Sequence, residues 1–175
     1  ANTDLVALSA HKFYGPKGVG VLFVRRNTPL IPAITGGDHE RDRRPGTVNV
    51  AGAVGLATAL RIAEDDRVAE NKRLLSLRER LIKGVLDAVP DCRVTGHPQR
   101  RLPHHASFVF RGVEGESIVQ ALDLAGIAAS SGAACAEGEP EPSFVLRALG
   151  LPTEWGIGSL RLTLGRTNTE EHISR

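Results

Sequence analysis

Methionine is absent from this chain of 175 residues, and cysteine, tryptophan and tyrosine are rare. The two cysteines, Cys92 and Cys135, stand far apart and outside any metal-type spacing, which argues against a disulfide framework or a zinc site. No hydrophobic run approaches the length that spans a membrane, and no signal-peptide pattern opens the chain. The 22 basic and 20 acidic residues nearly balance, so charge gives no case for binding nucleic acid or a membrane. A reducing, cytoplasmic setting is the simplest prediction.

What remains is the composition of an ordinary soluble globular protein, with 41% hydrophobic and 24% charged residues. A chain of this length can form one or two small domains with a real apolar core. Helical and strand-like hydrophobic patterns follow each other along the chain, and this alternation predicts an α/β layered fold. We expect helices at about 50–65, 68–89, 116–125 and 143–149, and strands at about 5–8, 19–24, 93–96, 106–110, 127–130 and 159–164.

Both ends of the chain resemble cuts through a longer polypeptide. No initiator methionine is present, and residue 1 falls just before an expected core strand. Residues 169–175 begin a capped helix that stops after about two turns. We therefore expect the chain to be a fragment.

The first candidate site is the segment SAHKFYGPKG at residues 9–18. It lies between two apolar runs and contains a glycine- and proline-rich turn, which predicts a β-hairpin that holds Lys12 rigidly at its crown. A fixed lysine beside phosphate-binding donors suits a Schiff base to an aldehyde cofactor. The alternative is a turn lysine in solvent, the usual fate of lysines, and this segment alone does not decide between the two.

The second candidate site is the segment SSGAACAEGEPEP at residues 130–142. Its small residues, glycines and prolines predict a loop, in which Cys135 is accessible and mobile. Mobility suits a thiolate that visits one partner and then hands something to another. An incidental surface thiol is the alternative as long as the two segments are considered separately.

Together the two segments resemble the cysteine desulfurases, which are pyridoxal-phosphate enzymes of the class V aminotransferase family. Each motif is weak by itself, but the ordered set covers nearly the whole chain with the family's spacing. The long cysteine loop is similar to the NifS/IscS type rather than the SufS type. The matching motifs are SAHK and GPKG within residues 9–18, GGDHER at 36–41, RPGT at 44–47, VEGES at 113–117, SSGAAC at 130–135, EPS at 141–143 and SLRLTLGR at 159–166.

The resemblance implies a fold type I pyridoxal-phosphate transferase. Residues 1–66 would be the end of the large cofactor-binding domain, and residues 67–175 the small C-terminal α/β domain with the cysteine loop. The chain would then be roughly the C-terminal half of a desulfurase. The isolated fragment is expected to be inactive, because the remaining cofactor contacts come from the other half.

The resemblance also assigns roles to single residues. Lys12 would bind the cofactor aldehyde and move the α-proton of the substrate, while Cys135 would attack the substrate sulfur. Ser9 and His11 would bind the cofactor phosphate, and Arg161 would bind the α-carboxylate of the substrate. No residue is assigned to a metal.

Thr47 is implied to reach the phosphate bound by the neighbouring subunit, which predicts a homodimer. It precedes a helix that begins near Val50, where free backbone N–H groups and a hydroxyl can bind phosphate. A threonine that only caps its own helix is an equally good interpretation of the sequence.

Other candidates keep open alternatives. Arg161 lies on an alternating strand, where a guanidinium can clasp a carboxylate, but it can also be a surface arginine on an edge strand. Arg166 competes with it for the same role. His104 and His105 are adjacent and point to opposite faces, so at most one could face an active site, and we interpret both as structural. Cys92 is predicted to lie on a turn and to be inert.

The implied reaction converts L-cysteine to L-alanine and leaves a persulfide on Cys135. That sulfur would pass to an acceptor protein, such as an iron–sulfur scaffold or a tRNA-thiolation protein. A different class V aminotransferase or β-lyase is one alternative, since it would keep Lys12 and Arg161 without needing Cys135. A docking fragment with no activity is the other.

Overall fold

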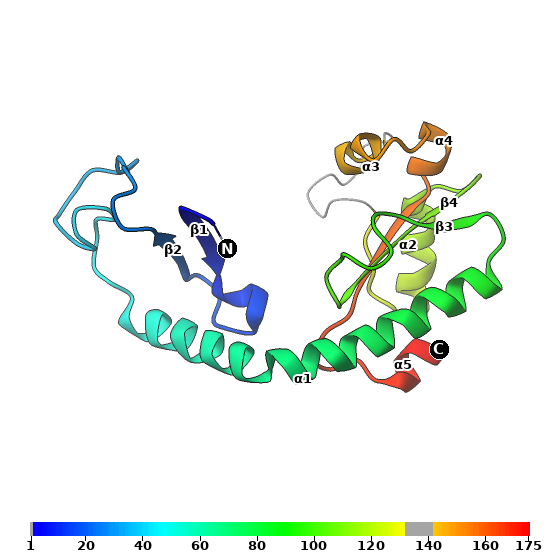
Figure 1. Cartoon of the computed structure of the whole chain (residues 1–175), viewed down its shortest axis with the longest axis horizontal. Helices are drawn as coiled ribbons and strands as arrows, with labels where there is room; N and C mark the ends of the chain where they lie inside the picture. Colours follow the sequence, from blue (N-terminus) through cyan, green and yellow to red (C-terminus); the bar gives the residue numbers. More distant parts are fainter. Residues whose placement is uncertain (1, 132–141) are drawn as a thin grey trace. The chain divides into compact units, whose positions relative to one another are not determined.

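The computed structural model describes residues 2–131 and 142–175. The chain divides into two compact units, a first unit of Ala1–Val68 and a second unit of Ala69–Arg175. The predicted boundary between the family's two domains, at residues 66 and 67, stays a prediction. The elements are β1 (Leu5–Ser9), the 3-10 helix η1 (Ala10–Phe13), β2 (Gly20–Val24), α1 (Val50–Ala88), β3 (Cys92–Val94), β4 (His105–Phe110), α2 (Gly115–Leu124), α3 (Phe144–Ala148), α4 (Thr153–Gly156), β5 (Ser159–Thr163) and α5 (Glu170–Ser174) (Figure 1).

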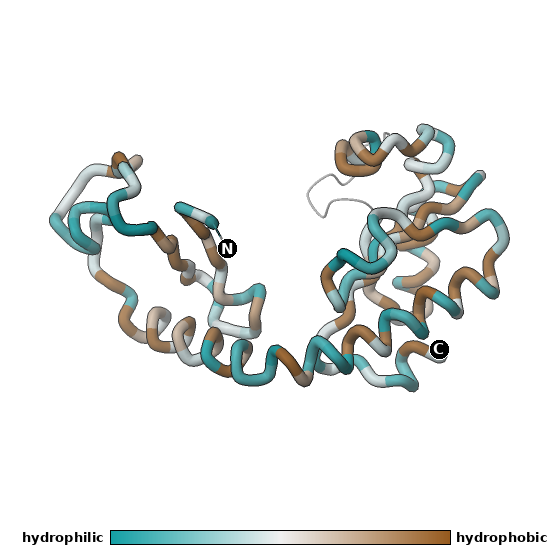
Figure 2. Tube along the Cα trace, viewed as in Figure 1, coloured by the Kyte–Doolittle hydropathy of each residue, from teal (hydrophilic) through white to brown (hydrophobic). Residues whose placement is uncertain are grey.

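The first unit contains the predicted hairpin, which the structure confirms. β1 and β2 pair in antiparallel register from Leu5 opposite Val24 to Ser9 opposite Gly20, and η1 forms the crown between them. Both strands are rich in hydrophobic residues (Figure 2). Branched and large apolar side chains favour extended backbone, which explains why the two runs form strands on either side of the glycine-rich turn.

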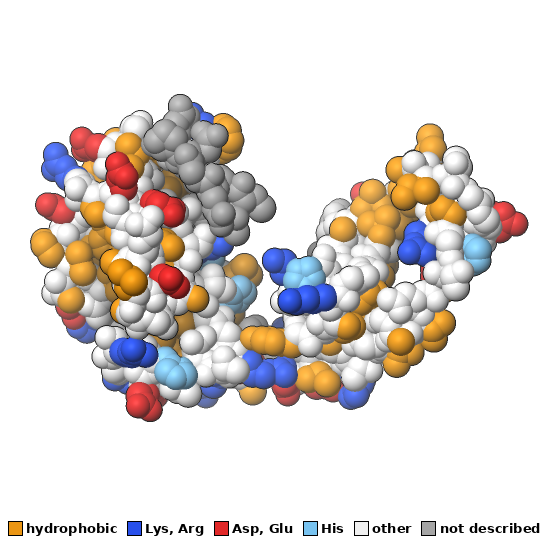
Figure 3. All heavy atoms as spheres, turned by 180° about the vertical axis from the view of Figure 1, so that it is seen from behind, with side chains coloured by type: hydrophobic (Ala, Val, Ile, Leu, Met, Phe, Trp, Pro, Cys, Tyr) orange, Lys and Arg blue, Asp and Glu red, His pale blue; other side chains and the backbone are white. Residues whose placement is uncertain are grey.

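Few hydrophobic side chains of the first unit are buried. In its described part, the buried ones are Ala10 and Leu56, whereas Phe23 and Ile31 are 53% and 91% exposed. Hydrophobic side chains are accordingly visible over the surface of this unit (Figure 3). Its order therefore depends more on backbone pairing and close helix contacts than on a large apolar core.

Helix α1 differs from the sequence prediction of two helices. It runs without a break from Val50 to Ala88, a length of 39 residues. The predicted gap at residues 66 and 67 contains neither glycine nor proline. Ion pairs between Arg61 and Asp65 (3.4 Å) and between Arg67 and Glu64 (2.8 Å) have helical spacing and support the backbone there.

The second unit is built around an antiparallel sheet in the order β3-β4-β5. Alternation along β4 and β5 sends one set of side chains to the face covered by α1 and α2. The predicted helix–strand alternation in this part of the chain is therefore confirmed. The buried residues of that core are Ala106, Phe108, Phe110 and Leu160, packed against partly buried residues that include Leu81 and Val85 of α1 and Ile118 and Leu122 of α2.

The opposite face of the sheet is apolar only at one end. There Val109 packs with Leu146 of α3 and Trp155 of α4. The Arg93 guanidinium lies 3.9 Å from the centre of the Trp155 ring, a cation–π contact. The rest of this face carries polar side chains and holds one of the candidate site residues.

The predicted strand at 127–130 is wrong. Only Ser130 forms a bridge, with Arg161, and the two residues exchange backbone hydrogen bonds of 2.7 and 3.2 Å. Small residues at 128–131 bring little strand propensity. Cys92 also differs from its predicted place on a turn, because it opens β3 opposite Phe110.

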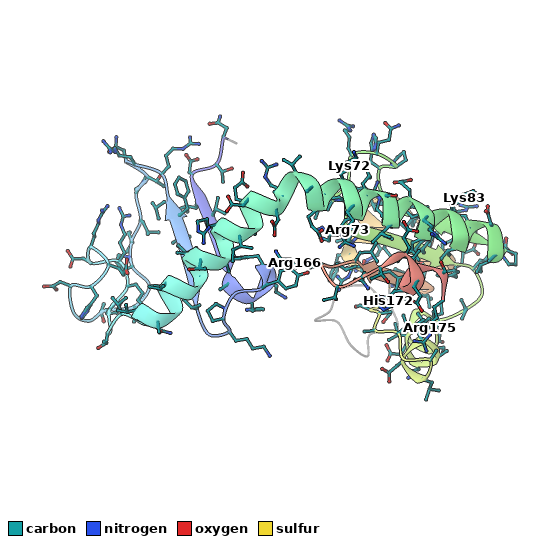
Figure 4. All side chains as sticks on the ribbon, turned by 90° about the horizontal axis from the view of Figure 1, so that it is seen from below. Lys72, Arg73, Lys83, Arg166, His172 and Arg175 are labelled. Atoms are coloured by element: carbon teal, nitrogen blue, oxygen red, sulfur yellow. The ribbon has the colours of Figure 1, made fainter. Side chains whose placement is uncertain are left out.

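The C-terminal segment is tied to α1 by Arg73 (Figure 4). The guanidinium donates hydrogen bonds to the carbonyl oxygens of Asn168 (2.6 Å), Gly165 (3.1 Å) and Arg166 (3.3 Å). Glu70 accepts two further hydrogen bonds from it. The helix predicted at the chain end is also confirmed, since the Thr169 hydroxyl accepts a hydrogen bond from the His172 backbone N–H (3.4 Å) and caps α5.

Within residues 2–131 and 142–175, no helix combines the length and the hydrophobicity needed to cross a membrane. The same residues contain no group of three or more His, Cys, Asp or Glu side chains placed to hold a metal ion.

Replacing Arg73 by alanine is expected to destabilise the second unit by about 1.5–3 kcal/mol, because three carbonyl groups lose a charged hydrogen-bond donor. Urea unfolding measures this change, and hydrogen exchange should accelerate at residues 165–168. Arg61→Ala is the control, since its ion pair with Asp65 is exposed and should contribute less than about 1 kcal/mol. Equal losses in the two variants would contradict the anchoring role.

Candidate functional site

The hairpin crown brings three of the predicted site residues together. Ser9 ends β1, and His11 and Lys12 lie on η1 immediately after it. All three side chains are exposed, and none makes a hydrogen bond or ion pair with another described residue. A hydroxyl, an imidazole and an amine on one short segment can donate to phosphate oxygens and add to an aldehyde. The chemistry of this donor set fits pyridoxal phosphate.

The backbone beneath Lys12 is held closely although its side chain is free. Ala10 is fully buried, and its N–H donates to the Val19 carbonyl at 3.1 Å. Its own carbonyl accepts from the Gly15 N–H at 2.9 Å, and a Cβ on Gly15 would lie 2.9 Å from the Ala10 Cβ. Only glycine fits there. On the other side, a Cβ on Gly55 of α1 would lie 3.0 Å from the Pro16 ring, so the crown packs tightly on the helix.

The start of α1 shows which residue caps this helix. The Gly52 N–H donates to Asn49 Oδ1 at 3.0 Å, which makes Asn49 the side-chain cap. Thr47 is exposed, and its carbonyl accepts a hydrogen bond from Arg44 Nη1 at 3.3 Å. The interpretation of Thr47 as the helix cap is therefore wrong. Its role toward a phosphate stays a prediction.

Arg161 lies in the second unit, at the middle of β5. It is partly buried, and its guanidinium makes no hydrogen bond or ion pair with any described residue. The competing Arg166 lies near Glu70. The pKa of the Glu70 carboxyl is lowered mainly by a hydrogen bond from Arg73, and the charge of Arg166 lowers it further. Of the two candidates, Arg161 is the one on the polar part of the sheet face, and its contact with a carboxylate stays a prediction.

Cys135 lies outside the described residues, so its prediction is unchanged by the structure. The other cysteine is described, and burial raises the pKa of the Cys92 thiol. A raised pKa keeps a thiol protonated at neutral pH, and the protonated form is a poor nucleophile. Cys92 packs beside the core of the second unit.

Sequence reasoning missed one feature of the polar face. His105 pairs with Thr163 and Ser107 pairs with Arg161, so all four residues share one side of the sheet. The alternating pattern of β4 shows that residues 105 and 107 point the same way. The sequence of neither strand by itself specifies the register that puts these residues beside Arg161.

A lysine on an ordered hairpin crown beside a hydroxyl and an imidazole, followed along the chain by an α/β unit with an arginine on its sheet, agrees with the fold type I pyridoxal-phosphate enzymes. Within that class, the chain belongs to the class V aminotransferase family, which it matches over residues 1–175. This confirms the resemblance and the predicted fold class.

The curated proteins most similar in sequence include several that are named cysteine desulfurase. The chain is 47% identical over 174 residues to the protein named cysteine desulfurase IscS of Clostridium botulinum, which covers 98% of this chain and 44% of that protein. It is also 47% identical to the protein of the same name from Methanosarcina thermophila, with 99% and 43% covered. The chain therefore spans less than half the length of these relatives.

Solved structures agree on the fold. A NifS-like protein superposes with a TM-score of 0.87 at 33% identity, over 99% of this chain and 44% of the other. DndA from Streptomyces lividans superposes with a TM-score of 0.71 at 35% identity, over 91% and 46% of the two chains. Class V enzymes use pyridoxal phosphate, which agrees with the donor set at the hairpin crown.

The capping assignment predicts different effects for two neighbouring substitutions. Asn49→Ala should cost about 1 kcal/mol of stability, because the Gly52 N–H loses its acceptor. Thr47→Ala should change stability by less than about 0.5 kcal/mol, since its exposed side chain has no structural contact. Urea unfolding of both variants measures the difference. A larger loss from Thr47→Ala than from Asn49→Ala would contradict the assignment.

Proposed function

We propose that the protein containing this chain is a cysteine desulfurase, which converts L-cysteine to L-alanine and holds the released sulfur as a persulfide on Cys135. The observation that carries the proposal is the 47% identity, across 98% of the chain, to proteins named cysteine desulfurase. The ordered crown at Lys12, with its free donors, supports a covalent cofactor site in the same chain.

The hairpin crown holds the cofactor in this proposal. The Ser9 hydroxyl and a His11 ring N–H would donate to its phosphate, and the Lys12 amine would bond to its aldehyde carbon. When bound, pyridoxal phosphate supplies an electron sink that makes the α-proton of the substrate acidic. Because the backbone around Lys12 is packed and hydrogen-bonded, the point from which the amine reaches the cofactor is fixed.

Lys12 Nζ then moves the α-proton of the substrate as a general base. The Cys135 thiolate attacks the sulfur of L-cysteine, forming the S–S bond while the C–S bond of the substrate breaks. The electron pair of that bond stays with the carbon, which takes a proton and leaves as the methyl group of L-alanine. The sulfur is kept on Cys135 as a persulfide, so the step needs no external oxidant or reductant.

Arg161 binds the α-carboxylate of the substrate. Its guanidinium is partly buried, has no acceptor among the described residues and carries several N–H donors. A bidentate pair with a carboxylate would satisfy them and fix the orientation of the amino acid.

The further expectations from the family belong to the same proposal. Thr47 reaches the phosphate held by a second copy of the chain, which makes the enzyme a homodimer. The persulfide passes to an acceptor protein, either an iron–sulfur scaffold or a tRNA-thiolation protein, and the enzyme works in the cytoplasm.

The full-length protein carrying Cys135→Ser should lose sulfide production from L-cysteine by at least about 100-fold, because no thiolate receives the sulfur. Its cofactor absorbance should stay, whereas Lys12→Ala should abolish both that absorbance and turnover. Sulfide release and the absorption spectrum are measured together. Cys92→Ser is the matched control, and it should keep wild-type turnover because Cys92 is a partly buried thiol with a raised pKa.

Unchanged turnover in Cys135→Ser would overturn the desulfurase assignment and favour another class V aminotransferase or lyase, which needs Lys12 and Arg161 alone. Loss of the cofactor absorbance in the unsubstituted full-length protein would instead favour a non-enzymatic docking role.

A further inference from the structure

The polar face of the β3-β4-β5 sheet carries a row of side chains that runs across the strands. Thr95 Oγ1 donates a hydrogen bond to Ser107 Oγ at 2.7 Å, and Ser107 lies directly opposite Arg161. Ser130 bridges to Arg161 from the other side. Arg161 is therefore flanked by hydroxyl groups, and its charge is not neutralised by any described acid.

His105 lies beside this row. It pairs with Thr163, two residues from Arg161 along β5, so its imidazole is a diagonal neighbour of the guanidinium. Diagonal neighbours across antiparallel strands are about 7–8 Å apart at Cα, within reach of long side chains. His104 precedes it in sequence, so strand alternation points the His104 side chain to the opposite side.

A second arginine adds positive charge next to His105. Arg101 donates hydrogen bonds to the carbonyls of His97 (2.8 Å) and Thr95, but its Nη1 atom is buried and has no partner among the described residues. A buried donor without an acceptor is costly, so an acceptor that reaches Arg101 Nη1 would be bound favourably.

Three positively charged or titratable groups act directly on His105. From the preceding segment and β5 come Arg101, His104 and Arg161. From α1 come Arg78 and Glu79, which pair with each other, and both act on Arg101. Glu116 belongs to α2, which covers the other face of the sheet, and its carboxylate accepts a hydrogen bond from the Ser131 hydroxyl at 3.2 Å.

The protonation of His105 is consistent with an excess of positive charge on this face. Burial is the main cause that lowers the pKa of its imidazole, and the charges of Arg101, Arg161 and His104 lower it further. Burial alone lowers the pKa of His104. A carboxylate placed between His105 and the two arginines would offset those charges and favour the protonated imidazole.

We propose that His105 and Arg101 extend the Arg161 site into one anion-binding face, on which His105 takes up a proton when the α-carboxylate of an amino acid binds. The inference rests on the proposed function only for the identity of that ligand. His105 is a binding residue that acts on the carboxylate and has no part in breaking the C–S bond.

The direction of the pH effect follows from proton linkage. If the bound carboxylate raises the pKa of His105, the extra affinity is fully present below the pKa of the free protein. It is lost as the pH rises through the pKa of the complex. The affinity for a carboxylate ligand therefore falls with rising pH, and the fall disappears when residue 105 cannot take up a proton.

The test uses the full-length protein and L-alanine, the product, as the probe. Isothermal titration from about pH 5.5 to about pH 8.5 spans the histidine range, and NMR of the imidazole signals reports protonation directly. In the wild type, affinity should fall roughly three- to tenfold across this range, and the pKa of His105 should rise on saturation with L-alanine. His105→Asn should remove this pH dependence, while His104→Asn, the matched control, should keep it.

An unchanged His105 pKa on saturation, a wild-type pH dependence in His105→Asn, or no binding of L-alanine overturns the inference. The NMR titration of the wild type needs no substitution, so a His105 variant that fails to fold does not remove the test. Failure of the proposed function has a different signature: L-alanine binds with the predicted pH dependence, but no sulfide is released from L-cysteine. If Arg161→Ala binds L-alanine as the wild type does, the carboxylate site is wrong, and both this inference and the role proposed for Arg161 fall.

Discussion

Antiparallel pairing between β4 and β5 determines both the core of the second unit and the direction of its candidate binding residues. The pairing keeps Phe108 and Leu160 on the face covered by helices, where full burial of such a side chain contributes about 1.5–3 kcal/mol. A slip of β5 by one residue would bury the Arg161 guanidinium in that core and expose Leu160. The hydrophobic face therefore specifies the register, and the register in turn holds Arg161, Ser107 and His105 on the opposite face.

A comparable constraint acts on the lysine. The crown of the hairpin is closed by hydrogen bonds at Ala10, and the contact between Ala10 and Gly15 leaves no space for a side chain at position 15. Backbone packing is thus concentrated directly beneath Lys12, while the amine itself contacts no partner in the described part of the chain. In both units, a rigid backbone carries a side chain whose hydrogen-bonding capacity is unused by the described residues. This combination is what a preorganised binding site requires.

The arginines of the second unit divide into two kinds. Arg78 is 2% exposed and is satisfied by Glu79 and by the Leu102 carbonyl, and Arg73 is engaged by Glu70 and three carbonyls. These charges stabilise the contacts of α1 with neighbouring segments. Among the residues that the structure describes, Arg161 has no such partner, and Arg101 keeps one buried donor unsatisfied. Counting arginines does not reveal this difference, because it depends on which carbonyl and carboxylate groups the fold brings to each guanidinium.

The sequence by itself determined the hairpin around Lys12, the strands β4 and β5 and the cap of α5. Each of these depends on a local signal that acts over a few residues: a glycine-rich turn, alternating apolar residues and a capping threonine. The ordered motifs were enough to identify the family. Only the tertiary structure decided that α1 is continuous, that Asn49 rather than Thr47 caps it, that residues 127–130 form a single bridge and that His105 stands beside Arg161. Strand pairing and the competition between neighbouring side chains for the same N–H group depend on contacts between residues that are placed by the whole fold, and no short stretch of sequence contains them.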